Sequence, residues 1–132
     1  MSSFVWPIRV YYEDTDAGGI VYYANYLKFF ERARTEMLRS LGFEQDELIA
    51  SAGIIFAVRS VQIDYLSPAR FNELLSVQST VSEIKKVSLT FGQLITRGDI
   101  ELCTATIRIA CLDPQTLRPK AIPENLLTHF KK

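Results

Sequence analysis

Residues 12–41, which read YEDTDAGGIVYYANYLKFFERARTEMLRSL, decide the fold of this chain. Apolar side chains recur in it at three- and four-residue spacing, which predicts an amphipathic helix over Ala24–Leu41: Tyr26, Phe29, Phe30, Ala33, Met37 and Leu41. Gly42 follows, as a left-handed helix end requires, and Arg39 suits the negative end of the helix dipole. At roughly 1.5 Å per residue the helix is about 27 Å long, enough to lie along a whole sheet.

Alternating and β-branched segments on both sides of this helix predict strands. The first strand carries its core face from Phe4 to Tyr12, and four more follow the helix: Ile54–Tyr65, Leu74–Ile84, Val87–Arg97 and Glu101–Leu112. Short connections between the last three are typical of hairpins. Glu44–Ala50 predicts an extra helical turn broken by Gly53, and the proline-containing tail from Asp113 predicts irregular chain ending in a helical turn.

Two strands allow their faces to be assigned. In Ile54–Tyr65, the alternation places Ile55, Ala57, Val61 and Ile63 on one face and Phe56 and Val58 on the other. In the last strand, Ala105, Ile107, Ile109 and Cys111 form the core face, opposite Thr104, Thr106 and Arg108. These patterns predict an α+β fold, an antiparallel sheet of about five strands with one long helix across it, as a single domain over residues 1–132.

Composition narrows the classes of function. The chain has 15 lysine and arginine residues and 15 aspartate and glutamate residues, so it carries no net charge that would favour binding to nucleic acid or to an anionic membrane. No uncharged run is long enough for a transmembrane segment, and the N-terminus lacks a secretory pattern, so we expect a cytoplasmic protein. Cys103 and Cys111 lie about 27 Å apart on one strand, which predicts buried thiols without a disulfide or zinc site.

The DTDAGG segment, residues 14–19, has three readings. In the first reading, the segment is an ordinary turn, in which aspartates accept backbone hydrogen bonds and glycines adopt positive φ. In the second, it is a metal-binding loop, but an EF-hand needs a glutamate at its twelfth position, where this chain has Asn25. Neither a dinucleotide nor a Walker phosphate spacing is present.

The third reading joins the carboxylate to the helix start. Unsatisfied amides near Tyr23 and Ala24 can polarise a carbonyl and stabilise the oxyanion formed when that carbonyl is attacked. Asp16 can then act as a nucleophile or as a general base for water. Together these groups predict acyl transfer to water.

The segments Tyr12–Tyr26 and Phe30–Glu36 resemble the signature of hotdog-fold acyl-CoA thioesterases, as does Asp64–Arg70. The similarity is to the 4-hydroxybenzoyl-CoA thioesterase family, and within it to the bacterial Tol-Pal-associated acyl-CoA thioesterases. The resemblance implies a sheet wrapped around the helix, subunits joined edge to edge as a homodimer or homotetramer, and active sites at the subunit interface. It implies no metal or redox cofactor, because coenzyme A is part of the substrate.

The resemblance also implies residue roles. Asp16 matches the catalytic carboxylate and the Tyr23 backbone amide matches the donor to the thioester carbonyl; the related subgroup commonly has histidine at the position of Tyr23. A tyrosine with a pKa near about 10 is a poor base, so Asp16 must act without a histidine. Substrate contacts are predicted for residues of the loop and of basic connections: Gly18, Val21, Arg70, Lys86 and Ser88. The Lys85–Ser88 hairpin is expected beside the pantetheine arm of the neighbouring subunit, and Arg97, Arg118 and Lys120 are further candidates for binding phosphate.

These expectations favour an acyl-CoA thioesterase. The alternative is a scaffold of the same fold that binds acyl-CoA or acyl carrier protein, or associates with envelope or lipid-synthesis proteins, with weak hydrolysis. A dehydratase shares the fold, but its sites usually pair a histidine with the carboxylate, and His129 in the tail is the only histidine here. The sequence leaves acyl chain length, and aromatic against aliphatic preference, open.

Overall fold

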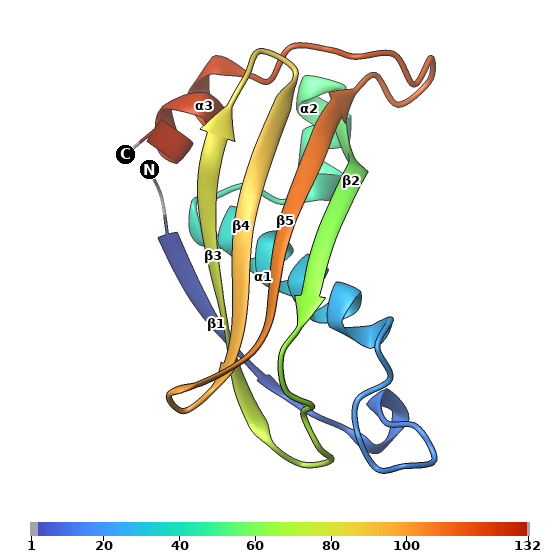
Figure 1. Ribbon diagram of the computed structural model, residues 1–132. Helices are drawn as coiled ribbons and strands as arrows, with labels where there is room; N and C mark the ends of the chain where they lie inside the picture. The colour runs from blue at the N-terminus through green and yellow to red at the C-terminus, as the bar shows by residue number, and fades with distance from the viewer. Residues whose placement is uncertain (1–2, 132) are drawn as a thin grey trace.

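The computed structural model describes residues 3–131 (Figure 1). Its five strands form one antiparallel sheet in the order β1-β3-β4-β5-β2. The strands are β1 (Ser3–Arg9), β2 (Ile55–Tyr65), β3 (Leu74–Ile84), β4 (Ser88–Arg97) and β5 (Ile100–Leu112). The helices are α1 (Asn25–Ser40), α2 (Gln45–Ala52) and α3 (Glu124–Lys131), with a short 3-10 turn η1 (Tyr12–Asp14). The predicted α+β class is confirmed.

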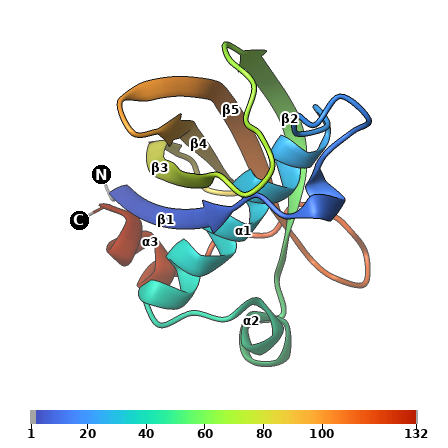
Figure 2. The same ribbon diagram turned by 90° about the horizontal axis from the view of Figure 1, so that it is seen from below.

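Helix α1 lies against the inner face of the curved sheet (Figures 1 and 2). Its apolar stripe from Tyr26 to Met37 is buried as predicted, and Leu41 is partly buried. Gly42 has φ +93°, as predicted for the helix end. The predicted stripe did not include Arg34, which is also buried, as is Leu38.

The predicted face assignment of β2 is wrong, because a β-bulge between Val58 and Ser60 shifts the register against β5. Val58 stands opposite Ile109, and Val61 stands opposite Ile107, so both share the core face of β5. The extra residue moves Phe56 and Val58 to the same side as Val61 and Ile63, leaving Ile55 and Ala57 on the other. The predicted core face of β5 is confirmed, since its apolar members are buried.

The first strand ends earlier than predicted. β1 stops at Arg9, and Tyr12 is exposed in η1 instead of continuing the core face. The cause is local: the Asp14 carboxylate accepts a hydrogen bond from the Tyr11 amide at 2.8 Å, and this turn replaces further strand pairing. The chain therefore bends away from the sheet just before the two aspartates.

The remaining elements close the ends of the core. α2 extends the predicted helical turn and stops at Gly53, which has φ +64°, as expected. The tail ends in α3, which buries Leu126 and Phe130. Cys103 and Cys111 are free and buried, as predicted. Within residues 3–131, no helix combines the length and apolarity needed to cross a lipid bilayer.

Candidate functional site

Asp14 fastens the loop to the start of α1. Its side chain is buried, with 5% of its surface exposed, and Oδ2 accepts the Tyr11 amide. Its carbonyl oxygen accepts the Tyr22 amide at 2.9 Å and the Asn25 side-chain amide at 2.9 Å. Asp14 therefore fits the interpretation of residues 14–19 as a structural turn, because its side chain and its carbonyl hold the backbone on both sides of the loop.

Asp16 lies at the exposed tip of the same loop. Its Oδ1 accepts the Gly18 amide at 2.8 Å, and within residues 3–131 Oδ2 has no hydrogen-bond partner. The Asp16 carbonyl accepts the Gly19 amide at 3.0 Å, where Gly19 takes φ +77°. One carboxylate oxygen is thus held by the loop, and the other is available to a ligand.

The first amides of α1 are open. The Asn25 amide donates to the Tyr22 carbonyl, and the Leu27 amide donates to the Ala24 carbonyl. The amides of Tyr23 and Ala24 have no acceptor in the described chain, and no side chain caps the helix. Because these amides lie at the positive end of the helix dipole, they can receive a carbonyl or an oxyanion.

An aromatic group joins this helix start to the end of β2. The Tyr65 hydroxyl donates to the Tyr23 carbonyl at 3.0 Å, and the rings of Tyr65 and Tyr26 meet edge to face. Desolvation raises the pKa of Tyr65. The Tyr23 ring is 61% exposed, so its side chain stands at the surface of this protomer while its carbonyl is held.

The structure gathers five of the predicted site residues at one end of the sheet. Gly18 contacts Asp16 directly, and Arg70 is paired by a β-bridge with Ile20 of the same loop. Val21 donates its amide to Ala69 at 2.8 Å, and its side chain is buried in the core. The site-end residues are Asp16, Gly18, Val21, Tyr23 and Arg70.

Lys86 and Ser88 lie elsewhere. Lys86 lies in the turn between β3 and β4, and Ser88 is the first residue of β4, at the end of the sheet opposite the blue loop that carries Asp16 (Figure 1). Lys86 is exposed and Ser88 is buried. One protomer therefore does not bring all seven predicted residues together.

Several predicted phosphate-binding cations have partners inside the protomer. Lys85 pairs with Glu83 at 3.2 Å, and Arg97 pairs with Glu73 at 3.0 Å. Lys120 donates to the Gly53 carbonyl at 3.0 Å, at the end of α2. Within the described part of the chain, the cations that have no ion pair are Arg9, Lys28, Arg32, Arg34, Arg59, Arg70, Lys86, Arg108, Arg118, Lys120 and Lys131.

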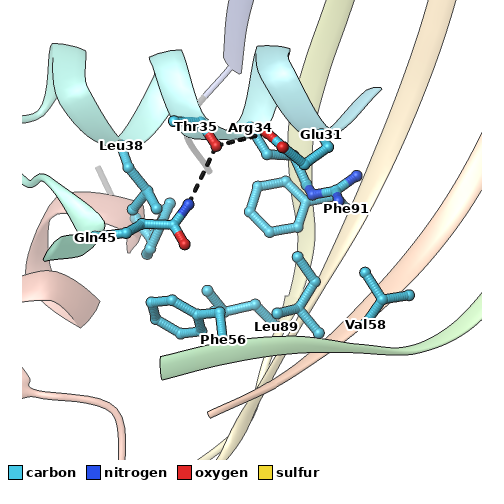
Figure 3. Close-up of a pocket in the computed structure, with 11 residues that line it drawn as sticks. Glu31, Arg34, Thr35, Leu38, Gln45, Phe56, Val58, Leu89 and Phe91 are labelled. Atoms are coloured by element: carbon cyan, nitrogen blue, oxygen red, sulfur yellow. Dashed lines mark hydrogen bonds between the residues drawn. The ribbon is translucent and has the colours of Figure 1, made fainter. Parts of the chain in front are cut away.

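A second feature was missed at the sequence level: a cavity of about 110 Å³ between α1 and the start of β2. Figure 3 shows Arg34 and Thr35 of α1 on one side, facing Phe56, Val58 and Leu89 across it. Arg34 stands four residues from Phe30 and four from Leu38, so helical spacing could have placed it on the buried face. Because arginine is charged, it was not assigned to the buried face of the helix.

Comparison with known proteins identifies close relatives. Residues 18–104 match the Thioesterase superfamily. The chain is 45% identical over 129 residues to "Acyl-CoA thioesterase YbgC" of Haemophilus influenzae, covering 98% of this chain and 95% of that protein. It is 43% identical over 130 residues to "Acyl-CoA thioester hydrolase YbgC" of Escherichia coli O157:H7, covering 98% and 96%.

Solved structures are similar over almost the whole fold. A probable thioesterase from Bartonella henselae superposes with a TM-score of 0.89 at 34% identity, covering 92% of this chain and 100% of the other. The gentisyl-coenzyme A thioesterase BH1999 superposes with a TM-score of 0.85 at 26% identity, covering 93% and 98%.

Proposed function

The chain belongs to the thioesterase superfamily, and on that premise we propose that it hydrolyses acyl-CoA thioesters. The predicted family and its hotdog fold are confirmed. The supporting observation is the carboxylate of Asp16 in a loop that leads directly into the open amides of α1. In the reaction, water adds across the C–S bond: its oxygen ends on the acyl carbon and its proton on the sulfur, giving a free acid and coenzyme A.

We assign the carbonyl to the amides of Tyr23 and Ala24. Negative charge develops on the thioester oxygen during attack, and donors at a helix start stabilise it without reorganising. Asp16 then attacks the acyl carbon itself or removes a proton from the attacking water. The Tyr23 side chain has no part in this scheme, because its carbonyl and ring are used to hold Tyr65.

Coenzyme A contacts are proposed to come from two copies of the chain. Arg70 and Gly18 lie beside the Asp16 loop, whereas Lys86 and Ser88 lie at the far end of the protomer. Strand β2 is an unpaired edge of the sheet whose Val58 and Val61 are exposed on the side facing α1. Unpaired apolar edges associate readily, so we propose a homodimer joined through β2, which can pair further into a tetramer.

The dimer is testable through its edge. Val61→Glu places a charge on the α1-facing side of the β2 edge, where Val61 is exposed, and is expected to give a monomer in sedimentation with strongly reduced hydrolysis. Gln62→Glu puts the same charge on the opposite face as a matched control. A monomeric wild-type protein with full activity would refute the shared site.

The substrate is tested by thiol release from short, long and aroyl-CoA thioesters. We expect clear turnover of at least one class, in keeping with a cytoplasmic enzyme that acts on intracellular CoA thioesters. Uniformly low rates together with tight acyl-CoA or acyl carrier protein binding would favour the alternative, a binding scaffold.

A further inference from the structure

Arg34 is a buried cation that has no ion-pair partner within residues 3–131. Only 7% of its surface is exposed. Its Nη1 donates to Gln93 Oε1 at 2.9 Å, and the Gln93 amide donates in turn to Ser79 Oγ at 2.7 Å and to the Phe30 carbonyl at 3.0 Å. All these partners are neutral. No carboxylate within residues 3–131 lies close enough to form an ion pair with Arg34.

Part of the Arg34 guanidinium has no hydrogen-bond acceptor in the described chain. With Nη1 bound to Gln93, Nε and Nη2 have no acceptor in the described chain, and Arg34 lines the cavity beside α1. Burial lowers the pKa of Arg34 to about 10, although attraction from Glu31 opposes this. A buried charge is costly without a partner, and two adjacent N–H groups match the two oxygens of a carboxylate.

The cavity is small and mostly apolar. Besides Arg34, its polar lining residues are Glu31, Thr35 and Gln45, and the Glu31 carboxylate accepts a hydrogen bond from the Thr35 hydroxyl at 2.9 Å. Phe56, Leu89, Phe91 and Ile109 contribute to its walls. A cavity of roughly 150 Å³ accommodates benzene, so this cavity of about 110 Å³ fits a short aliphatic chain better than a substituted ring. A ligand that fills it would have a few methylene groups and one anionic end.

The two ends of β2 indicate how a substrate reaches this cavity. Phe56 and Val58 border the cavity, whereas Tyr65 binds the helix start beside the Asp16 loop. Along one strand Phe56 and Tyr65 are about 30 Å apart at roughly 3.3 Å per residue. In a two-fold dimer paired antiparallel through β2, the Tyr65 end of one copy faces the Phe56 end of the other, at a strand spacing of about 4.8 Å.

We propose that Arg34 determines substrate specificity by binding the distal carboxylate of a short ω-carboxyacyl group whose thioester lies in the Asp16 site of the other copy. This inference rests on the proposed thioesterase function and dimer, and it names the class of substrate. The substrates are mono-CoA thioesters of short dicarboxylic acids, and the product is the free dicarboxylic acid.

The experiment compares glutaryl-CoA with pentanoyl-CoA, which have the same number of acyl carbons and differ in the terminal carboxylate. Wild-type kcat/KM is expected to be at least about tenfold higher for glutaryl-CoA, the scale of a charge-assisted hydrogen-bonded pair. Arg34→Met keeps an unbranched apolar stem and should reduce that ratio to about one or below. Arg34→Lys retains charge without the two-pronged geometry and should give an intermediate ratio.

Arg32→Met is the matched control, because Arg32 is exposed on the same helix and should leave the ratio unchanged. A measurement on the wild-type protein guards against misfolding of the Arg34 variants: free glutarate should inhibit pentanoyl-CoA hydrolysis more strongly than free pentanoate. Equal wild-type rates, equal inhibition, or a ratio that survives Arg34→Met would overturn the role of Arg34 and leave the thioesterase proposal intact. Hydrolysis of no CoA thioester at all would overturn the proposed function itself.

Discussion

Asp14 and Asp16 stand two positions apart in one loop, and their carboxylates meet different surroundings. Asp14 is buried and accepts the Tyr11 amide, while its carbonyl receives hydrogen bonds from Tyr22 and Asn25. Asp16 is exposed, and only one of its carboxylate oxygens is bound, by Gly18. The first aspartate shapes the loop, and the second is presented by it.

This contrast distinguishes the aspartate that stabilises the fold from the aspartate that is available for catalysis. A carboxylate with satisfied, buried hydrogen bonds contributes to folding, whereas a free carboxylate oxygen in the loop that leads into open helix amides is available to a substrate. Changes at Asp14 should therefore act on the free energy of unfolding, and changes at Asp16 should act on turnover.

The largest effect is expected from Asp16→Asn. Removing the base or nucleophile should lower kcat by roughly 10²–10⁴-fold, the range for general acid–base catalysis. The unfolding free energy should change by no more than about 0.5 kcal/mol, because the side chain is exposed and asparagine can still accept the Gly18 amide. Thiol-release kinetics and urea unfolding measure both quantities. Wild-type turnover in this variant would refute the mechanism.

Asp14→Ala should show the opposite pattern. It leaves the Tyr11 amide without its acceptor and opens space in the core, so we expect a loss of about 2 kcal/mol in unfolding free energy. Asp14→Asn keeps an acceptor oxygen and should lose less. The comparison fails if Asp14→Ala unfolds at the wild-type urea midpoint.

The two glycines of the loop sharpen the contrast further. Gly19 has φ +77°, so Gly19→Ala should cost about 1 kcal/mol of stability through backbone strain. In Gly18→Ala, the new Cβ would lie 3.2 Å from Asp16 Oδ1, which must move aside. This variant should keep its stability and lose kcat several-fold. Parallel urea unfolding and thiol-release assays test the pair, and equal responses from both variants would contradict the assignment.

Tyr65→Phe should have the smallest effect. It removes the hydroxyl that donates to the Tyr23 carbonyl, a partly solvated bond worth about 0.5–1 kcal/mol. Because the Tyr23 amide, not its carbonyl, is assigned to the substrate, kcat should stay within about twofold. A drop as large as that of Asp16→Asn would show that the hydroxyl acts directly in the reaction.

Sequence patterns predicted the helices and strands well in segments where one side-chain periodicity holds throughout. The stripe of α1 and the hairpins of β3, β4 and β5 follow from helical spacing, alternation and short connections. They failed where a local bond or an inserted residue broke the period. The Asp14 hydrogen bond ended the first strand early, and the bulge near Ser60 exchanged the faces of β2.

The site shows the same division. Asp16 and the helix start are adjacent in the chain, so their association is readable from spacing. Arg34 was overlooked because charged residues are usually exposed. Its partner Gln93, and Ser79 to which Gln93 donates in turn, come from strands more than forty residues away. Lys86 and Ser88 were predicted to reach the site from the neighbouring subunit, and within one protomer they lie at the opposite end from the Asp16 loop.

By itself the sequence determined which segments form helix and strand, because side-chain periodicity selects backbone geometry locally. It also determined that a carboxylate precedes a helix start. Only the tertiary structure decided which aspartate is buried, which faces of β2 turn inward and that Arg34 lines a cavity. Burial and long-range hydrogen bonding depend on residues that come together only after the sheet has closed around α1.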